Sequence, residues 1–179
     1  MRIIGGEYRS RILADIKGDN VRPTSDRARE ALFNILGLRV RGARVLDLFA
    51  GSGALGIESL SRGAKEATFN DVSKDSVAIV KKNLALLKAE EKARVYQTDF
   101  AAFLNLAKAP FDLIFIDPPY RFDYGEKALQ IISDKGLLTE NGIAVYERDC
   151  PFAGEIAGLD KFDERKYGKA YLTFFRRKI

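Results

Sequence analysis

A glycine-rich loop directly after a short apolar run is the feature that most constrains the fold of this chain. Residues 45–49 read VLDLF, a pattern typical of a buried strand, and Gly51, Gly53 and Gly56 follow at once. Glycines between a strand and a helix let the backbone approach a ligand where a Cβ atom would collide. Their spacing matches the dinucleotide fingerprint, and Asp71, 20 residues after Gly51, is the acid expected on a ribose. The pattern predicts a nucleoside-type cofactor at the carboxyl end of this strand.

Strand and helix patterns alternate along the residues that follow. Strands that alternate with helices predict an α/β fold, a mostly parallel sheet with right-handed crossovers and helices on both faces. The chain ends differently, because residues 162–167 and 170–175 predict two antiparallel strands joined by a tight turn at Gly168 and Lys169. Between these two regions the patterns predict strands at 67–70, 94–97, 111–116 and 143–147. They also predict a helix from the glycine loop to about residue 61 and helices at 77–87, 100–106 and 125–135.

The N-terminal residues predict a small arm. Residues 2–5 and 8–13 are expected to form two short strands, which would pair as a hairpin around two glycines. Thr24 or Ser25 can cap a following helix, which is expected to end at Gly37.

Positive charge is concentrated in this N-terminal region. The chain has 30 Lys+Arg and 25 Asp+Glu; residues 1–44 hold 10 basic and 5 acidic side chains, whereas residues 45–179 hold 20 of each. Arginine binds phosphate in a bidentate manner and stacks on bases, so the excess favours a polyanionic partner over a merely solvated basic surface. We therefore divide the chain into a basic hairpin arm and helix, 1–40, and an α/β domain, 41–179.

Missing residue types exclude several classes of enzyme. The chain has no histidine and a single cysteine, Cys150, so it can form neither a Ser-His-Asp triad nor a zinc site of histidines or thiolates, and no metal is expected. No apolar run reaches the roughly 18 residues of a membrane span. The first residues lack the apolar core of a secretory signal, so we expect a cytoplasmic protein that does not enter a membrane.

Two acids favour S-adenosylmethionine over NAD as the cofactor. Asp47 directly precedes the glycine loop, where a carboxylate suits a cationic amino-acid group and would be a poor neighbour for a pyrophosphate. Asp99 and Phe100 follow the third strand, where they could hold an adenine amine and ring face, although Asp99 could equally be a helix N-cap. The candidate cofactor-binding residues are Asp47, Phe49, Gly51, Ser52, Gly53, Asp71, Asp99 and Phe100.

A second motif, DPPY, follows the fourth strand at residues 117–120. Two prolines fix φ and remove two backbone donors, so the loop is stiff and presents acceptors, the Asp117 carboxylate and the Pro118 carbonyl. Both can accept hydrogen bonds from one exocyclic NH₂ group, and Tyr120 can stack on the base that carries it. A rigid turn without catalytic function is the alternative for Asp117, Pro118, Pro119 and Tyr120. The order of DLFAGSG and DPPY favours methyl transfer to a base amine.

The chain resembles, nearly end to end, the family of small-subunit ribosomal RNA guanine-N2 methyltransferases, the RsmD type. The resemblance rests on RIIGGEYRSRIL at 2–13, RPTSDRAREALFNIL at 22–36, LDLFAGSGALGIESLSRGA at 46–64, DPPY at 117–120 and KYGKAYLTFF at 166–175. It implies a class I methyltransferase (Rossmann-like) fold, with a seven-stranded sheet whose last strand is antiparallel. It also implies methylation of the exocyclic N2 amine of a guanine in 16S ribosomal RNA.

The resemblance further implies a monomer that acts on ribosomal RNA or the assembling small subunit. Two departures concern contacts: the family often has glutamate where Asp71 stands, and its arm commonly reads Gly-Arg-Lys/Arg where this chain has Ser10-Arg11-Ile12. The residues expected to contact RNA are Arg2, Arg9, Arg11, Arg22, Thr24 and Arg27.

Other functions remain open from the sequence. A DNA adenine-N6 or cytosine-N4 amino-methyltransferase shares DPPY but normally has a larger target-recognition region. A small NAD-linked oxidoreductase would use the same glycine loop, and a catalytically silent RNA-binding protein could have the same fold.

Overall fold

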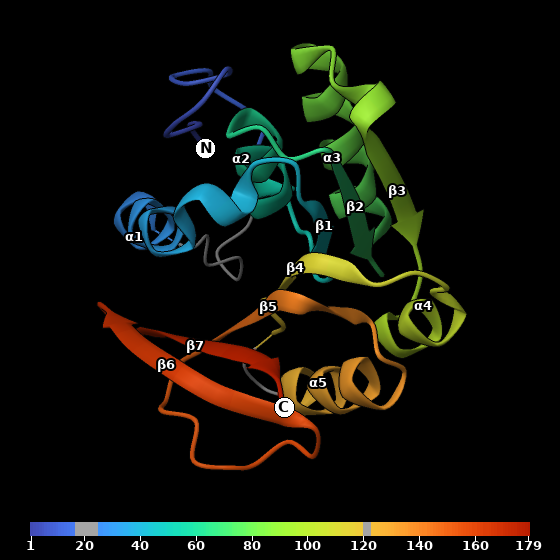
Figure 1. The fold of residues 1–179 in the computed structure, drawn as a ribbon. Helices are drawn as coiled ribbons and strands as arrows, with labels where there is room; N and C mark the ends of the chain where they lie inside the picture. Colours follow the sequence, from blue (N-terminus) through green and yellow to red (C-terminus); the bar gives the residue numbers. More distant parts are fainter. Residues whose placement is uncertain (17–24, 120–122) are drawn as a thin grey trace.

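The computed structural model describes residues 1–16, 25–119 and 123–179. These residues form a seven-stranded sheet in the order β3-β2-β1-β4-β5-β7-β6 (Figure 1). The strands are β1 (Arg44–Asp47), β2 (Glu66–Asp71), β3 (Ala93–Gln97), β4 (Phe111–Ile116), β5 (Leu138–Arg148), β6 (Leu159–Tyr167) and β7 (Ala170–Arg177). The helices are α1 (Asp26–Leu36), α2 (Ala54–Ser61), α3 (Lys74–Leu87), α4 (Phe100–Leu106) and α5 (Tyr124–Asp134), with short 3-10 helices at Gly37–Val40 and Glu90–Lys92.

The strand directions agree with the prediction. Strands β1 to β5 pair in parallel, and β7 pairs antiparallel with both β5 and β6. The chain reverses between β6 and β7 at Gly168, whose φ of 60° suits glycine. Strand β5 starts at Leu138, five residues before the predicted start, and its pairing with β4 shifts between Phe111 and Leu113. An extra stretch of strand with a register shift could not be inferred from apolar residues alone.

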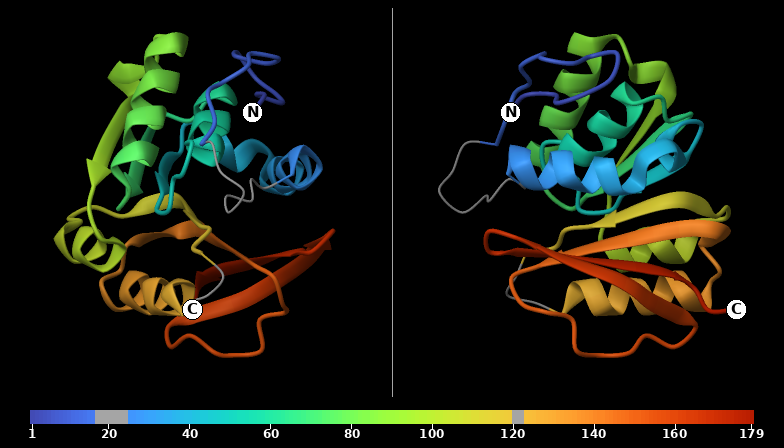
Figure 2. Two further views of the ribbon diagram at one scale, coloured as in Figure 1. Left: turned by 180° about the vertical axis from the view of Figure 1, so that it is seen from behind. Right: turned by 60° about the vertical axis from the view of Figure 1, so that its left-hand side comes forward.

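Helices cover both faces of the sheet, with α1, α2 and α3 on one face and α4 and α5 on the other (Figures 1 and 2). Successive strand residues point to opposite faces, so the core divides into two clusters. On the α1 face, Phe33 of α1 and Ile57 of α2 pack with Phe69 of β2. On the α5 face, Leu104 of α4 and Leu129 of α5 pack with Ile114 of β4.

The N-terminal arm reverses direction as predicted, but its two predicted strands are reduced to one antiparallel bridge, between Arg2 and Ile12. The Ile3 N–H still donates to the Arg11 carbonyl across the arm (3.0 Å). The regular pairing ends there, because the arm turns onto α2: the buried Glu58 carboxylate accepts hydrogen bonds from the backbone N–H groups of Ile4 (2.9 Å) and Gly5 (2.8 Å).

The arm continues along α2 to its last turn. The Glu7 N–H donates to the Ser61 carbonyl (2.7 Å), and the Tyr8 N–H donates to the Ser61 hydroxyl (2.9 Å). A Cβ atom at Gly6, whose φ is 80°, would lie 1.9 Å from the Ser61 carbonyl oxygen. Ile3, Tyr8 and the α1 side chains belong to the same core cluster as the sheet, so arm, helix and sheet pack as one body.

Helix α1 begins and ends as predicted, and Ser25 is the cap. The Ser25 hydroxyl accepts a hydrogen bond from the Ala28 N–H (3.1 Å), and Gly37 follows the last helical residue. Arg29, counted above among the basic residues, is buried: its Nη2 donates to the Arg2 carbonyl (2.5 Å) and to Asp26 (2.9 Å). This guanidinium holds the arm to α1 and is not available to an external partner.

Gly6→Ala should destabilise the protein strongly, because the new Cβ would meet the Ser61 carbonyl and the residue would keep a positive φ. Together these effects should lower the free energy of unfolding by about 2–4 kcal/mol. Gly136→Ala is the control, since Gly136 also has a positive φ (61°) but nothing lies within 4 Å of its Cβ position; its loss should be about 1 kcal/mol. Urea denaturation measures both, and equal losses would contradict the close packing of the arm.

Candidate active site

Four acidic side chains gather at the carboxyl ends of neighbouring strands. Asp47 and Asp71 end β1 and β2, Asp117 directly follows β4, and Glu147 lies near the end of β5. Asp47 pairs with Phe115 and Phe115 with Val145, so Asp117 and Glu147, two residues further on, share the α1 face with Asp47. The carboxyl edge of such a sheet is the usual position of a ligand crevice.

The glycine loop is shaped by two of these acids. The Asp71 carboxylate accepts hydrogen bonds from the Gly51 N–H (2.9 Å) and from the Ser73 N–H (2.8 Å). Gly51 and Gly53 have φ values of 56° and 84°, and Gly53 is the N-cap of α2. A carboxylate has about four acceptor positions, so Asp71 can still accept a hydrogen bond from a ligand hydroxyl.

Asp47 is buried below the first turn of α2. One carboxylate oxygen accepts a hydrogen bond from the Gly56 N–H at 2.9 Å, and only 2% of the residue is exposed. Burial raises the pKa of Asp47 to about 7, the Gly56 hydrogen bond lowers it, and the nearby charge of Asp71 raises it. The carboxyl group therefore changes charge near neutral pH and can respond to a cationic ligand.

Asp117 and Glu147 form the second acidic pair of the edge. Burial raises the pKa of Asp117 well above its usual value, and the charges of Glu147 and Asp47 raise it further. Glu147 is only 5% exposed. Glu147 was not among the predicted site residues; the available signal was an acid that ends the apolar strand run IAVYE, at the same edge as Asp117.

Aromatic rings line the neighbouring part of the edge. Phe49 and Phe100 have ring centroids 5.3 Å apart, and Phe100 lies 5.2 Å from Tyr124, a residue that the sequence analysis did not select. Asp99 is the N-cap of α4, with one carboxylate oxygen accepting from the N–H groups of Ala101 (2.9 Å) and Ala102 (3.2 Å). Asp99 is therefore a helix N-cap, which was the alternative to a cofactor contact. Its second carboxylate oxygen takes no part in these hydrogen bonds.

The N-terminal segment reaches the glycine loop through Asn83 of α3. This fully buried amide accepts from the Ala14 N–H (2.8 Å) and donates to the carbonyls of Ala14 (3.0 Å) and Ser52 (3.1 Å). A Cβ atom at Gly51 would lie 3.8 Å from Ile16, so the segment forms a wall beside the loop. Asn83 was not predicted, because nothing in its local sequence indicates a contact 69 residues away.

Four of the candidate RNA residues lie within the described part of the chain. Arg2, Arg9, Arg11 and Arg27 are all exposed, with Arg27 in the first turn of α1.

Pro118 is buried and Pro119 is exposed in the loop after β4. Three predicted site residues, Arg22, Thr24 and Tyr120, lie outside the described residues.

The described part of the chain has neither a cluster of metal ligands nor a helix that could cross a membrane. Residues 1–16, 25–119 and 123–179 contain no group of three or more His, Cys, Asp or Glu side chains that could hold a metal ion. Within the same ranges, the helices are too short or too polar to cross a membrane.

Comparison with known proteins places this chain in a family. The family model described as "Conserved hypothetical protein 95" matches residues 1–176. Ribosomal RNA small subunit methyltransferase D of Escherichia coli K12 is 40% identical over 149 residues, which cover 83% of this chain and 75% of that protein. The "Putative rRNA methyltransferase YlbH" of Bacillus subtilis is 34% identical, over 99% of this chain and all of that protein.

A solved structure agrees with this assignment. The chain named "Putative methyltransferase yhhF from Escherichia coli" superposes with a TM-score of 0.90 at 36% identity, covering 99% of this chain and 98% of that one. The class I methyltransferase fold predicted from the sequence is thereby confirmed. The chain belongs to the conserved hypothetical protein 95 family, the family of ribosomal RNA small subunit methyltransferase D.

Proposed function

We propose that this protein methylates the exocyclic N2 amine of a guanine in small-subunit ribosomal RNA, with S-adenosylmethionine as the methyl donor. The observation that carries the proposal is the adjacency of β1 and β4, which pair directly: β1 ends in Asp47, and Asp117 directly follows β4. A cofactor held at the glycine loop after β1 therefore lies beside an amine held by the loop after β4. The names of the relatives support ribosomal RNA as the substrate.

The side chains at the carboxyl edge fit this cofactor, which supplies a methyl group already activated on a sulfonium. The buried Asp47 carboxyl would bind the cationic amino-acid group, and its ionisation would be favoured by that contact. Asp71 would accept from a ribose hydroxyl. Phe49 and Phe100 would bind the adenine ring, with the unused Asp99 oxygen accepting from its amine.

The residues after β4 would hold the amine in line with the methyl group. A base amine is a poor nucleophile, because its lone pair is delocalised into the ring. The Asp117 carboxylate and the Pro118 carbonyl would accept its two N–H bonds and direct the lone pair toward the methyl. When the methyl group passes from sulfur to nitrogen, positive charge would develop on the amine nitrogen, and the Asp117 and Glu147 carboxyls would stabilise it until the proton is released to solvent. S-adenosylhomocysteine would be the second product.

General magnitudes are consistent with a mechanism of positioning. Orientation of two reactants can contribute about 7–11 kcal/mol. The base must leave its stack, which costs a few kcal/mol, and stacking on Tyr120 would recover roughly 1–3 kcal/mol. The chain's own residues thus need to orient and desolvate the amine, without a strong base.

The alternatives are separated by product and ligand. A DNA amino-methyltransferase would modify adenine or cytosine, and an NAD-linked enzyme would bind NADH more tightly than S-adenosylhomocysteine. The buried acid beside the glycine loop disfavours a pyrophosphate.

The test is mass mapping of modified nucleotides in ribosomal RNA from cells lacking this protein: one N2-methylguanine should be missing from the small-subunit RNA. The expected partner is ribosomal RNA or the assembling small subunit in the cytoplasm.

Asp117→Ala should lower methyl transfer to ribosomal RNA by about 100-fold or more, because stabilisation of the developing charge is lost. The dissociation constant of S-adenosylhomocysteine, measured by calorimetry, should change by no more than about threefold. That is less than the tenfold change that corresponds to about 1.4 kcal/mol. Asp134→Ala is the control, since Asp134 is a carboxylate at the far end of α5 bound by Gln130. A tritiated-methyl assay that shows normal transfer in Asp117→Ala would contradict the role of Asp117.

Binding of S-adenosylhomocysteine should weaken below neutral pH. Asp47 has a pKa of about 7 in the free protein, so acid converts it to the neutral form, which binds an ammonium group poorly. Proton linkage then predicts an affinity about eightfold lower at pH 6 than at pH 7.5. Asp47→Asn should bind more weakly at pH 7.5 and lose most of this dependence. Calorimetry at several pH values between 6 and 7.5 measures this dependence. If the affinity of Asp47→Asn depended on pH as strongly as that of the wild type, another group would be responsible for the titration.

Reversing Arg22 and Arg27 to glutamate should weaken RNA binding and flatten its dependence on salt, because phosphate contacts release counterions. Filter binding at several salt concentrations measures both effects. An unchanged slope would count against the N-terminal region as a site of phosphate contact.

A further inference from the structure

We infer that the turn between β6 and β7 is a second RNA-contacting element, which binds the phosphate backbone on the side of the active site away from the N-terminal arm. This inference rests on the proposed function and extends it to residues that the sequence analysis left unassigned.

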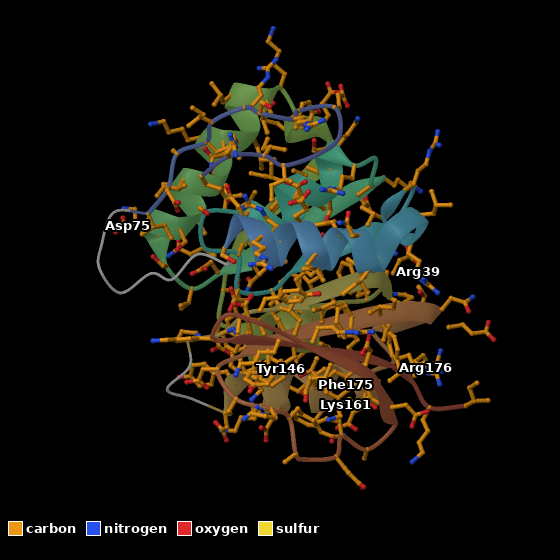
Figure 3. The ribbon with its side chains drawn as sticks, turned by 90° about the vertical axis from the view of Figure 1, so that its left-hand side faces the viewer. Arg39, Asp75, Tyr146, Lys161, Phe175 and Arg176 are labelled. Atoms are coloured by element: carbon orange, nitrogen blue, oxygen red, sulfur yellow. The ribbon has the colours of Figure 1, made fainter. Side chains whose placement is uncertain are left out.

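The β6–β7 turn lies at the active-site edge of the sheet. Strand β7 pairs antiparallel with β5, with Leu172 opposite Glu147 and Tyr171 opposite Arg148. The beginning of β7 is therefore level with the carboxyl end of β5, and the turn at Gly168 and Lys169 projects beyond it. Figure 2 (right) shows this turn, in red, at the same end of the molecule as the beginning of α1. In Figure 3 it lies on the same side as Asp75 and opposite Arg39 and Arg176.

The hairpin is strongly basic, although basic and acidic residues are equal in number over residues 45–179 as a whole. Residues 159–179 contain seven Lys+Arg and three Asp+Glu, whereas residues 45–158 contain 13 and 17. The even balance over 45–179 thus averages a basic hairpin with an acidic remainder. Of the seven basic residues, Arg165, Lys166 and Lys169 lie at or next to the turn. Positive charge at the rim of an acidic site suits a polyanionic substrate whose base enters the site.

Two of the three acids of the hairpin, those nearest the turn, are already engaged. Glu164 accepts from the Phe152 N–H (2.9 Å) and the Thr173 hydroxyl (2.8 Å), and Asp163 pairs with Arg165 at 3.0 Å. Lys166 and Lys169 are exposed, and neither forms a salt bridge with any residue in 1–16, 25–119 or 123–179.

An aromatic ring accompanies the two lysines. The Lys166 Nζ lies 5.3 Å from the centroid of the Tyr171 ring, which is partly exposed beside the turn. Alternating cationic and aromatic side chains can contact phosphates and stack on unpaired bases. Among polyanions, this combination favours RNA with unstacked nucleotides, which a flipped target base would leave next to the site.

The N-terminal arm leaves this side of the site uncovered. Its tip, residues 5–8, binds the last turn of α2 around Ser61. Helix α2 begins at the glycine loop and has eight residues, so its last turn lies about 12 Å from the loop. Arg9 lies beside this tip, whereas Lys169 lies at the carboxyl edge itself. Contacts on both sides of the active site would hold the nucleotides that flank the target base.

The test compares two pairs of charge reversals at opposite ends of the same hairpin. Lys166→Glu/Lys169→Glu changes the turn, and Arg177→Glu/Lys178→Glu makes the same charge change at the other edge of the sheet, where both residues are exposed. The full chain is assayed for filter binding of a small-subunit ribosomal RNA transcript, methyl transfer to it, affinity for S-adenosylhomocysteine and melting temperature. The turn variant should bind RNA about tenfold more weakly, with a salt slope smaller by about 2.

The control variant should bind RNA within about twofold of the wild type, since it removes no proposed phosphate contact. Cofactor affinity and melting temperature should be unchanged in both. Equal RNA binding by turn variant and wild type, or equal losses in turn variant and control, would overturn the inference. Wild-type protein that binds the transcript but transfers no methyl would refute the proposed function, and the comparison of RNA affinities would still decide the hairpin's role.

Discussion

The hydrogen bond from the Gly56 N–H to the buried Asp47 carboxylate is the interaction on which the active-site edge depends. It joins the end of β1 to the first turn of α2 and so fixes the loop between them. Gly56 is required for this approach, because a Cβ there would lie 2.3 Å from the Phe69 ring of β2. The glycines of one motif therefore have separate functions: Gly56 packs the helix on the sheet, whereas Gly51 and Gly53 adopt positive φ in the loop.

Features that depend on neighbouring residues could be predicted from the sequence. The alternation of strands and helices, the reversal at Gly168 and the gathering of Asp47, Asp71 and Asp117 at one edge all follow from local patterns and the rules of parallel sheets. The N-terminal arm pairs over a shorter length than predicted for the opposite reason. The N–H groups of Ile4 and Gly5 bind Glu58 of α2, more than 50 residues away, and no local pattern shows where the hairpin pairing gives way to that contact.

The same distinction explains the site residues that were missed. Asn83 bridges Ala14 and Ser52, and its function is visible only when three segments are brought together. Glu147 becomes significant only because β5 lies next to β4, so that its charge acts on Asp117. For Asp99, the helix N-cap and the contact with a cofactor do not exclude each other: one carboxylate oxygen caps α4, and the other is still available to a ligand.

In the proposed function an acidic site receives RNA, whose phosphates its carboxylates would repel, and burial of the carboxyls reduces this repulsion. Four carboxyls at one edge would repel phosphates strongly if all were ionised at neutral pH. Burial and mutual repulsion raise the pKa of Asp47 to about 7 and that of Asp117 well above its usual value, so the edge carries less negative charge before a ligand binds. A cationic cofactor would then ionise Asp47 without increasing the net negative charge. In the proposed function, exposed basic side chains at the rim, such as Arg27 and Lys169, would attract the RNA backbone, while Asp47 and Asp71 would bind the cofactor and Asp117 and Glu147 would act on the base that enters the site.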